Sequence, residues 1–115
     1  MPDLPHHHAP HSFDHMPQIE EFLIAADFFK LMSDPSRARL FWLLCHCEEC
    51  VINLSAMMQM TSPAISHHLK LLKACGLIRS RREGKEVYYR AAETPIAQAL
   101  HQMVEGLVRI SCPGN

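Results

Sequence analysis

The stretch TSPAISHHLKLLK, residues 61–73, constrains the fold most, because it predicts a short amphipathic helix. Ser62 is a residue type that caps helices, and Pro63 suits the first helical position, where its missing N–H costs nothing. Spacing at i, i+4 and i+7 predicts an apolar stripe of Ile65, Leu69 and Leu72. The opposite side carries Ser66, His67, Lys70 and Lys73. A solvated helix face has the same composition, so this helix alone does not decide its role.

A basic β-hairpin is predicted directly after this helix. Cys75-Gly76 stops the helix, and strands over 77–82 and 86–91 flank a Glu83-Gly84-Lys85 turn. A helix followed by a basic hairpin indicates the recognition helix and wing of a winged helix-turn-helix. The fold class expected is therefore mainly α with a small β-hairpin (α+β).

Charge is distributed unevenly along the chain. The net charge is only −1, yet residues 62–90 contain seven Lys and Arg against two Glu, and the remainder contains four basic and ten acidic residues. One basic edge on an acidic body is the pattern expected of a protein that docks on phosphate.

Four further helices are expected from apolar periodicity and capping residues. They cover Ile19–Met32, Ser36 to about His46, Val51–Met60 and about 17 residues after Thr94. The candidate capping residues are Ser33 or Asp34 for the second helix, Asn53 for the third and Thr94 for the last. The third and fourth of the five helices then form the helix-turn-helix. We expect a His- and Pro-rich N-terminal arm over 1–18, one domain over 19–112 and a tail over 113–115.

The last helix has a long apolar stripe that needs a partner. A homodimer would cover it, and the interface residues we expect are Phe22, Ile96, Leu100, Met103 and Leu107. Packing of the same stripe on its own domain is the alternative. The chain has neither a continuous apolar run of about 18 residues nor a basic, apolar leader, so we expect a cytoplasmic protein without a membrane partner.

Four segments of the chain resemble the ArsR/SmtB family of bacterial repressors over roughly residues 20–111. They are 32–37 (MSDPSR), 62–70 (SPAISHHLK), 76–78 (GLI) and 82–89 (REGKEVYY). The resemblance implies a homodimeric winged-helix repressor of the cytoplasm that leaves operator DNA when it binds an inducer. It does not imply an enzyme.

The resemblance also assigns DNA contacts. Ser62, Ser66 and His67 fall where family members touch DNA, with Lys70 behind them. Hydroxyl and imidazole groups suit base edges or phosphates, whereas Lys and Arg neutralise phosphate. The full expected set is Ser62, Pro63, Ser66, His67, Lys70 and Lys73 on the helix and Arg81, Arg82 and Lys85 on the wing. His68 is expected to be structural.

The sensor site departs from the better-known family patterns. The metal site between the terminal helices is expected to be absent, because only Glu93 is retained, and Pro95, Gly106 and Arg109 occupy the other three places. Instead the chain carries C-H-C-E-E-C over 45–50, a spacing that lets sulfurs converge on one soft cation. The metal ligands we expect are Cys45, Cys47, Cys50 and Cys112, with His46, His101 and Glu105 as weaker candidates.

The sequence is compatible with several inducers and with two other functions. The metal or metalloid would be zinc, cadmium, lead or arsenite. A redox or reactive-sulfur sensor that pairs Cys45, Cys47 or Cys50 with Cys112 is the alternative. A thiol-dependent reductase is less favoured, because Glu48 and Glu49 would raise the pKa of a thiol that a nucleophile needs lowered. Small buried thiols without a ligand would be the plain structural explanation.

Overall fold

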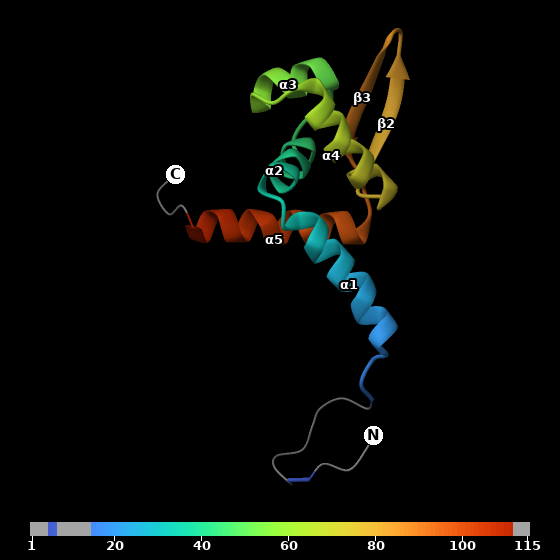
Figure 1. Cartoon of the computed structure of the whole chain (residues 1–115), viewed down its shortest axis with the longest axis vertical. Coiled ribbons are helices and arrows are strands. Elements are labelled where there is room, and N and C mark those ends of the chain that lie inside the picture. Colours follow the sequence, from blue (N-terminus) through green and yellow to red (C-terminus); the bar gives the residue numbers. More distant parts are fainter. Residues whose placement is uncertain (1–4, 7–14, 112–115) are drawn as a thin grey trace.

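The computed structural model describes residues 5–6 and 15–111 of the chain (Figure 1). His7, His8, His11 and Cys112, together with the predicted tail over 113–115, lie outside the described residues. The elements in chain order are α1 (Ile19–Met32), α2 (Pro35–Leu44), β1 (Glu49–Cys50), α3 (Val51–Met58), α4 (Ser62–Ala74), β2 (Ile78–Glu83), β3 (Glu86–Ala91) and α5 (Pro95–Ser111). The prediction of five helices plus a hairpin is confirmed.

Helix α1 projects away from the body of the molecule and buries little of its own surface (Figure 1). Its bounds are those that the sequence predicted, and it has one buried residue, Leu31. Large apolar side chains of α1 are more than half exposed, namely Phe22, Leu23, Ile24 and Phe29. An isolated apolar helix surface of this kind requires something to cover it.

Capping residues fix where α2, α4 and α5 begin. Of the two predicted caps of α2, Asp34 is the one that acts: it accepts from the backbone N–H of Arg37 at 2.9 Å. The predicted cap of α4 was wrong by one residue: Thr61 rather than Ser62 accepts, from the N–H of Ala64 at 3.3 Å. Ser62 and Pro63 are instead the first two helical residues. Thr94 caps α5 as predicted, accepting from Ala97 at 3.2 Å.

Helices α2 and α3 are shorter than the periodicity predicted. α2 ends at Leu44 rather than near His46, and α3 ends at Met58 because Gln59 takes a left-handed backbone conformation (φ 53°). Cys50, not Asn53, is the N-cap residue of α3. Asn53 lies inside the helix and donates to Glu49 Oε2 at 2.8 Å.

The sheet contains a strand that the sequence did not predict. Its order is β1-β3-β2, and all neighbours are antiparallel. β2 and β3 form the expected hairpin, with Gly84 at φ 63° in the turn, where a residue without Cβ is favoured. β1 pairs Glu49 with Tyr89 and Cys50 with Tyr88, so the cysteine segment is attached to the wing.

The hydrophobic core lies where α2, α3 and α4 meet the base of the hairpin and the start of α5. The side chains at its centre have relative exposures of 0–2%: Leu40, Phe41, Leu44, Leu54, Ile65, Leu69, Leu72 and Leu77. Three of them, Ile65, Leu69 and Leu72, form the predicted apolar stripe of α4. The core therefore holds this helix by its apolar side. Within the described part of the chain, no helix has both the length and the apolarity to cross a bilayer.

Candidate DNA interface and inducer site

Helix α4 presents its polar side chains to solvent while the core holds its apolar side. The exposed residues are Ser62, Pro63, Ser66, His67, Lys70 and Lys73. His68 is buried, at 8% exposure, with Nε2 at 4.0 Å from Asp34 Oδ1. Burial lowers the pKa of His68, and the Asp34 carboxylate partly opposes this. His68 therefore belongs to the packing of α4 against the start of α2, as the sequence suggested.

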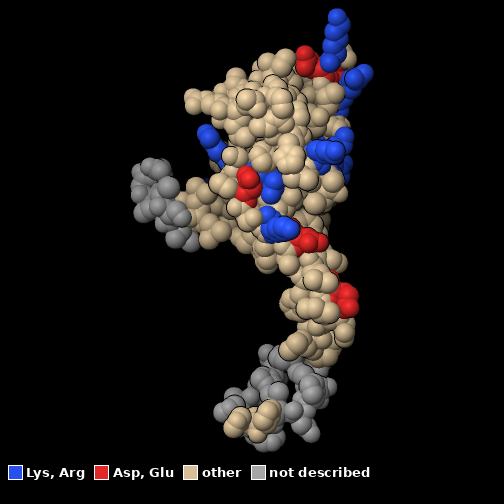
Figure 2. Space-filling view, in the orientation of Figure 1, with Lys and Arg blue, Asp and Glu red and all other residues tan. Residues whose placement is uncertain are grey.

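The wing extends the basic surface beyond α4. Arg79, Arg82 and Lys85 are exposed on the hairpin. Lys73 Nζ donates to Ser80 Oγ at 2.7 Å, which ties the end of α4 to β2. Figure 2 shows Lys and Arg side chains gathered along the edge of the molecule that carries the hairpin. The polar front of α4 and the basic wing thus form one continuous region of the fold.

Arg81 differs from Arg79, Arg82 and Lys85 because it is paired with two carboxylates. It donates to Glu83 Oε2 at 2.8 Å and to Glu48 Oε1 at 2.8 Å, and it lies 5.0 Å from the centre of the Tyr88 ring. These bonds raise the pKa of Arg81 and lower that of Glu48. Sequence reasoning missed Glu48 as a partner of the wing, because the pairing of β1 with β3 creates the contact.

The cysteines of the 45–50 segment do not all face one place. Cys45 and Cys47 line a pocket of about 330 Å³ together with Glu48, Arg90 and His101. Cys50 is buried in β1 and does not line this pocket. Cys47 Sγ donates to the Leu43 carbonyl at 3.4 Å. The structure therefore brings two of the three clustered sulfurs to one surface.

Both pocket thiols have a raised pKa. Burial, with a smaller effect of the Glu105 carboxylate, raises the pKa of Cys45 to about 11. Burial, then Glu49, raises the pKa of Cys47. A nucleophilic thiol needs the opposite shift, so this site does not have the electrostatics of a thiol reductase. A metal ion would bind here by displacing the thiol protons.

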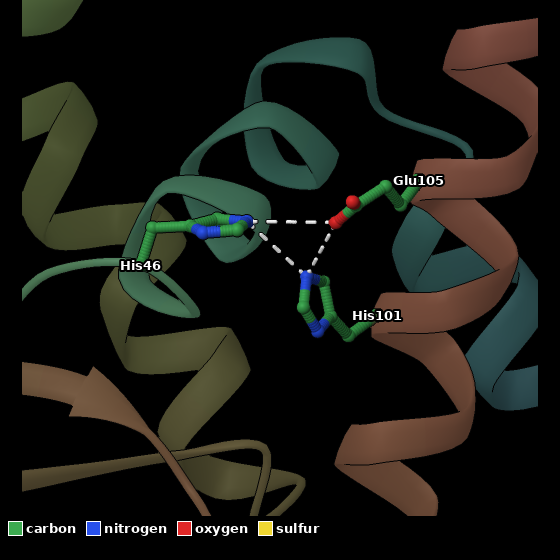
Figure 3. Close-up of side chains that lie close together, drawn as sticks. All are labelled: His46, His101 and Glu105. Atoms are coloured by element: carbon green, nitrogen blue, oxygen red, sulfur yellow. Dashed lines mark hydrogen bonds and ion pairs between the residues drawn. The ribbon is translucent and has the colours of Figure 1, made fainter.

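Three weaker candidates from the sequence converge on one point (Figure 3). His46 follows α2, whereas His101 and Glu105 are one turn apart on α5. His101 Nε2 is 3.2 Å from His46 Nε2 and 2.8 Å from Glu105 Oε2, and His46 Nε2 is 3.6 Å from the same oxygen. In the described residues no other three His, Cys, Asp or Glu side chains place their ligand atoms within 4.8 Å of one another.

The expected dimer residues divide into two groups. Phe22, Ile96, Met103 and Leu107 are 38–58% exposed on α1 and α5. Leu100 is 6% exposed and packs in the core of its own chain.

The fold and this arrangement of helix and wing define a winged helix-turn-helix protein. Residues 34–80 match the family model described as bacterial regulatory protein, arsR family. The arsenic resistance transcriptional regulator ArsR1 of Pseudomonas putida is 34% identical over 91 residues, which cover 78% of this chain and 70% of that relative. The chain belongs to the ArsR family. The fold and the relatives are those of transcriptional regulators and not of enzymes.

Other similar proteins agree with this assignment. The transcriptional repressor SmtB homolog of Synechocystis sp. is 37% identical over 82 residues, or 71% of this chain, and the match spans 62% of that relative. Among solved structures, reduced HlyU from Vibrio cholerae has a TM-score of 0.69 at 28% identity, covering 82% of this chain and 95% of that one. NolR from Sinorhizobium fredii has a TM-score of 0.70 at 27% identity, covering 84% and 96%.

Proposed function

We propose that this protein is a transcriptional repressor that binds operator DNA through α4 and the wing and leaves it when an inducer binds. The observation that carries the proposal is that the polar front of α4 lies beside the basic wing, joined to it by the hydrogen bond from Lys73 to Ser80. Ile65, Leu69 and Leu72 fix the back of α4 at 0–2% exposure, and its front offers hydroxyl, imidazole and ammonium groups. A helix of this width fits the major groove, and the wing cations Arg82 and Lys85 would hold the adjacent backbone.

We propose that the protein acts as a homodimer through α1 and α5. Both helices expose apolar side chains that the single chain leaves uncovered, such as Phe22, Ile96 and Met103. A two-fold pair would present two copies of α4 to successive major grooves. Replacing Phe22 or Met103 by Glu should shift the sedimentation coefficient from dimer to monomer. Ile52→Glu is the matched control, because Ile52 is 65% exposed on α3, which lies away from α1 and α5 (Figure 1).

The inducer we propose is a metal or metalloid ion of the zinc, cadmium, lead or arsenite group. Cys45 and Cys47 line one pocket, and Cys50 and Cys112 remain candidates for completing a thiolate set. Relatives named for arsenic and cadmium resistance support this class of inducer. The ion weakens DNA binding only as far as it binds the free repressor more tightly than the DNA-bound repressor. Weakening DNA binding about 150-fold therefore takes about 3 kcal/mol of coupling.

The route from pocket to wing that we propose passes through β1. Glu48 lies next to Cys47, lines the same pocket and binds Arg81 of the wing. β1 is hydrogen-bonded to β3, so a shift of the 45–50 segment on metal binding displaces the hairpin relative to α4. This would change the spacing of the DNA-contacting surfaces without unfolding either one.

The test is fluorescence anisotropy of the reduced protein on its own promoter, titrated with zinc, cadmium, lead, arsenite and polysulfide. The proposal expects tight, salt-sensitive binding that one metal or metalloid weakens. Weakening by polysulfide alone would support the alternative sensor that pairs Cys45, Cys47 or Cys50 with Cys112. If no compound weakens the complex, the sensor proposal fails. Binding that is insensitive to salt would contradict phosphate docking.

A further inference from the structure

We propose that His46, His101 and Glu105 form a binding site for a single borderline divalent cation of the zinc type, within one protomer and separate from the cysteine sulfurs. The three side chains come from two elements, since His46 follows α2 and the other two lie on α5 (Figure 3). A cation there would connect the end of α2 to α5.

The spacing of the three ligand atoms fits a small tetrahedral ion. Zinc binds imidazole nitrogen and carboxylate oxygen at about 2.0–2.2 Å, which places neighbouring tetrahedral ligands about 3.3 Å apart. The His46 to His101 and His46 to Glu105 separations are 3.2 and 3.6 Å. The His101 to Glu105 separation is 2.8 Å, so this pair would open by a few tenths of an ångström. Side-chain rotation alone can supply that change, because none of the three is fully buried.

No protonation state of the two imidazoles makes all three contacts among His46, His101 and Glu105 favourable. A neutral imidazole offers at most one proton at Nε2, and the Nε2 atoms of His46 and His101 face each other as well as the same Glu105 oxygen. If both nitrogens are protonated they repel across 3.2 Å, and if one is bare it has a lone pair aimed at the centre. A cation uses the lone pairs of all three atoms together.

Neighbouring groups orient these ligands. Arg109 donates to Glu105 Oε1 at 2.8 Å, which occupies one carboxylate oxygen and leaves Oε2 for an ion. The Trp42 ring lies 4.5 Å from the His46 ring and limits its rotation. Groups that position metal ligands in this way are a regular part of metal sites. The side chains are 27–43% exposed, so an ion and a completing water can reach the site.

The choice of metal follows from the donors. Two nitrogens and one oxygen favour zinc or cobalt over the softer cadmium and lead that thiolates prefer. Cys45 and Cys47 lie nearby, but neither sulfur is within 4.8 Å of all three ligand atoms of His46, His101 and Glu105. The inference concerns binding alone and holds whether or not the ion releases DNA.

The test measures metal binding by the reduced full-length chain. All proteins carry Gln in place of the five arm histidines, so that the remaining imidazoles outside the site are His67 and His68. Zinc affinity comes from competition with a chelator, and cobalt spectra show whether sulfur binds. The variants are His46→Gln, His101→Gln and Glu105→Gln. The matched control is His67→Gln, an exposed imidazole on α4. Every protein in the series also carries Cys45→Ser and Cys47→Ser, so that zinc bound by the proposed inducer site does not enter the measurement.

We expect one zinc per protomer, with affinity reduced about tenfold or more in each site variant and unchanged in His67→Gln. Cobalt should give visible bands without a sulfur charge-transfer band. Circular dichroism and a thermal melt confirm that each variant is folded. Absence of zinc binding in the parent of this series, unchanged affinity in His46→Gln and His101→Gln, or a strong sulfur band would each overturn the proposal. None of these outcomes depends on release from DNA.

Discussion

Arg81 of the wing is bound to Glu48 of the cysteine segment by two contacts, from Nε at 2.8 Å and from Nη2 at 2.7 Å to the same Oε1 atom. Glu48 also approaches Arg90 Nε at 3.7 Å. Glu48, one of the two residues between Cys47 and Cys50, thus neutralises cations beside the proposed DNA surface. This pair gives the coupling proposal a specific contact to test.

Changing Glu48→Gln should strengthen operator binding at low salt. The amide leaves Arg81 with one carboxylate partner, Glu83, so the guanidinium becomes available to a phosphate. The slope of log affinity against log salt should become steeper by about 1 per protomer, because one more counterion is released. Anisotropy titrations at four or five salt concentrations measure this slope.

The matched control for that experiment is Glu86→Gln. Glu86 is an exposed acid on the same hairpin, and the change in charge is identical. A general charge effect would alter both variants equally. Equal slopes in the two variants would therefore contradict a specific role for the Arg81–Glu48 pair.

Neighbouring substitutions on α4 should separate stability from DNA binding. Ile65→Ala removes a side chain with 0% exposure and should lower the free energy of unfolding by about 2–5 kcal/mol. Ser66→Ala, on the exposed front, should change it by less than about 0.5 kcal/mol. Loss of about one hydrogen bond should nevertheless weaken operator binding roughly fivefold. Urea denaturation and anisotropy test the pair, and full operator affinity in Ser66→Ala would remove that residue from the interface.

The thiols should react with iodoacetamide in a definite order. Cys75 is exposed at the end of α4, whereas Cys45 is half-buried and has a pKa of about 11. At pH 8 only about 0.1% of Cys45 is thiolate, and the thiolate is the reactive form. Mass spectrometry of timed samples should show Cys75 modified first and Cys45 at least tenfold more slowly. Equal rates would contradict the described environment of Cys45.

Burial of His68 should make stability depend on pH. Its pKa is lowered in the folded protein from an ordinary value of 6.5, so below that pH the unfolded chain binds more protons. The free energy of unfolding should therefore fall as pH drops below about 6.5, by at most about 1.4 kcal/mol per pH unit, and level off below the folded pKa. His68→Gln should lack this component of the slope, and His67→Gln should retain it. A His68→Gln profile parallel to that of the parent protein would argue against the effect.

Local patterns in the sequence predicted most of the fold. The spacing of Ile65, Leu69 and Leu72 identified the buried side of α4, and Thr94 marked the start of α5. The cap of α4 was misassigned because Thr61 and Ser62 are both capping residues, and only the backbone geometry separates them. Strand β1 was missed because two residues carry no alternating pattern, and its partner Tyr88 is distant in sequence.

The two candidate metal sites were harder to predict from the sequence than the fold was. The sequence identified His46, His101 and Glu105 individually, and the i, i+4 spacing joined the last two. His46 is separated from His101 by 55 residues, and only the packing of α2 on α5 brings them together. Conversely, the close spacing of Cys47 and Cys50 suggested convergence, yet β1 buries Cys50 away from the pocket that Cys47 lines.

The most direct measurement for the repressor proposal is operator affinity with and without cadmium, in the parent protein and in a Cys45→Ser, Cys47→Ser double variant. Cadmium should weaken operator binding by the parent protein at least tenfold, equivalent to about 1.4 kcal/mol of coupling. The double variant should bind the operator normally and ignore cadmium. Equal weakening in both proteins, or none in the parent, would contradict the assignment of these cysteines as the switch.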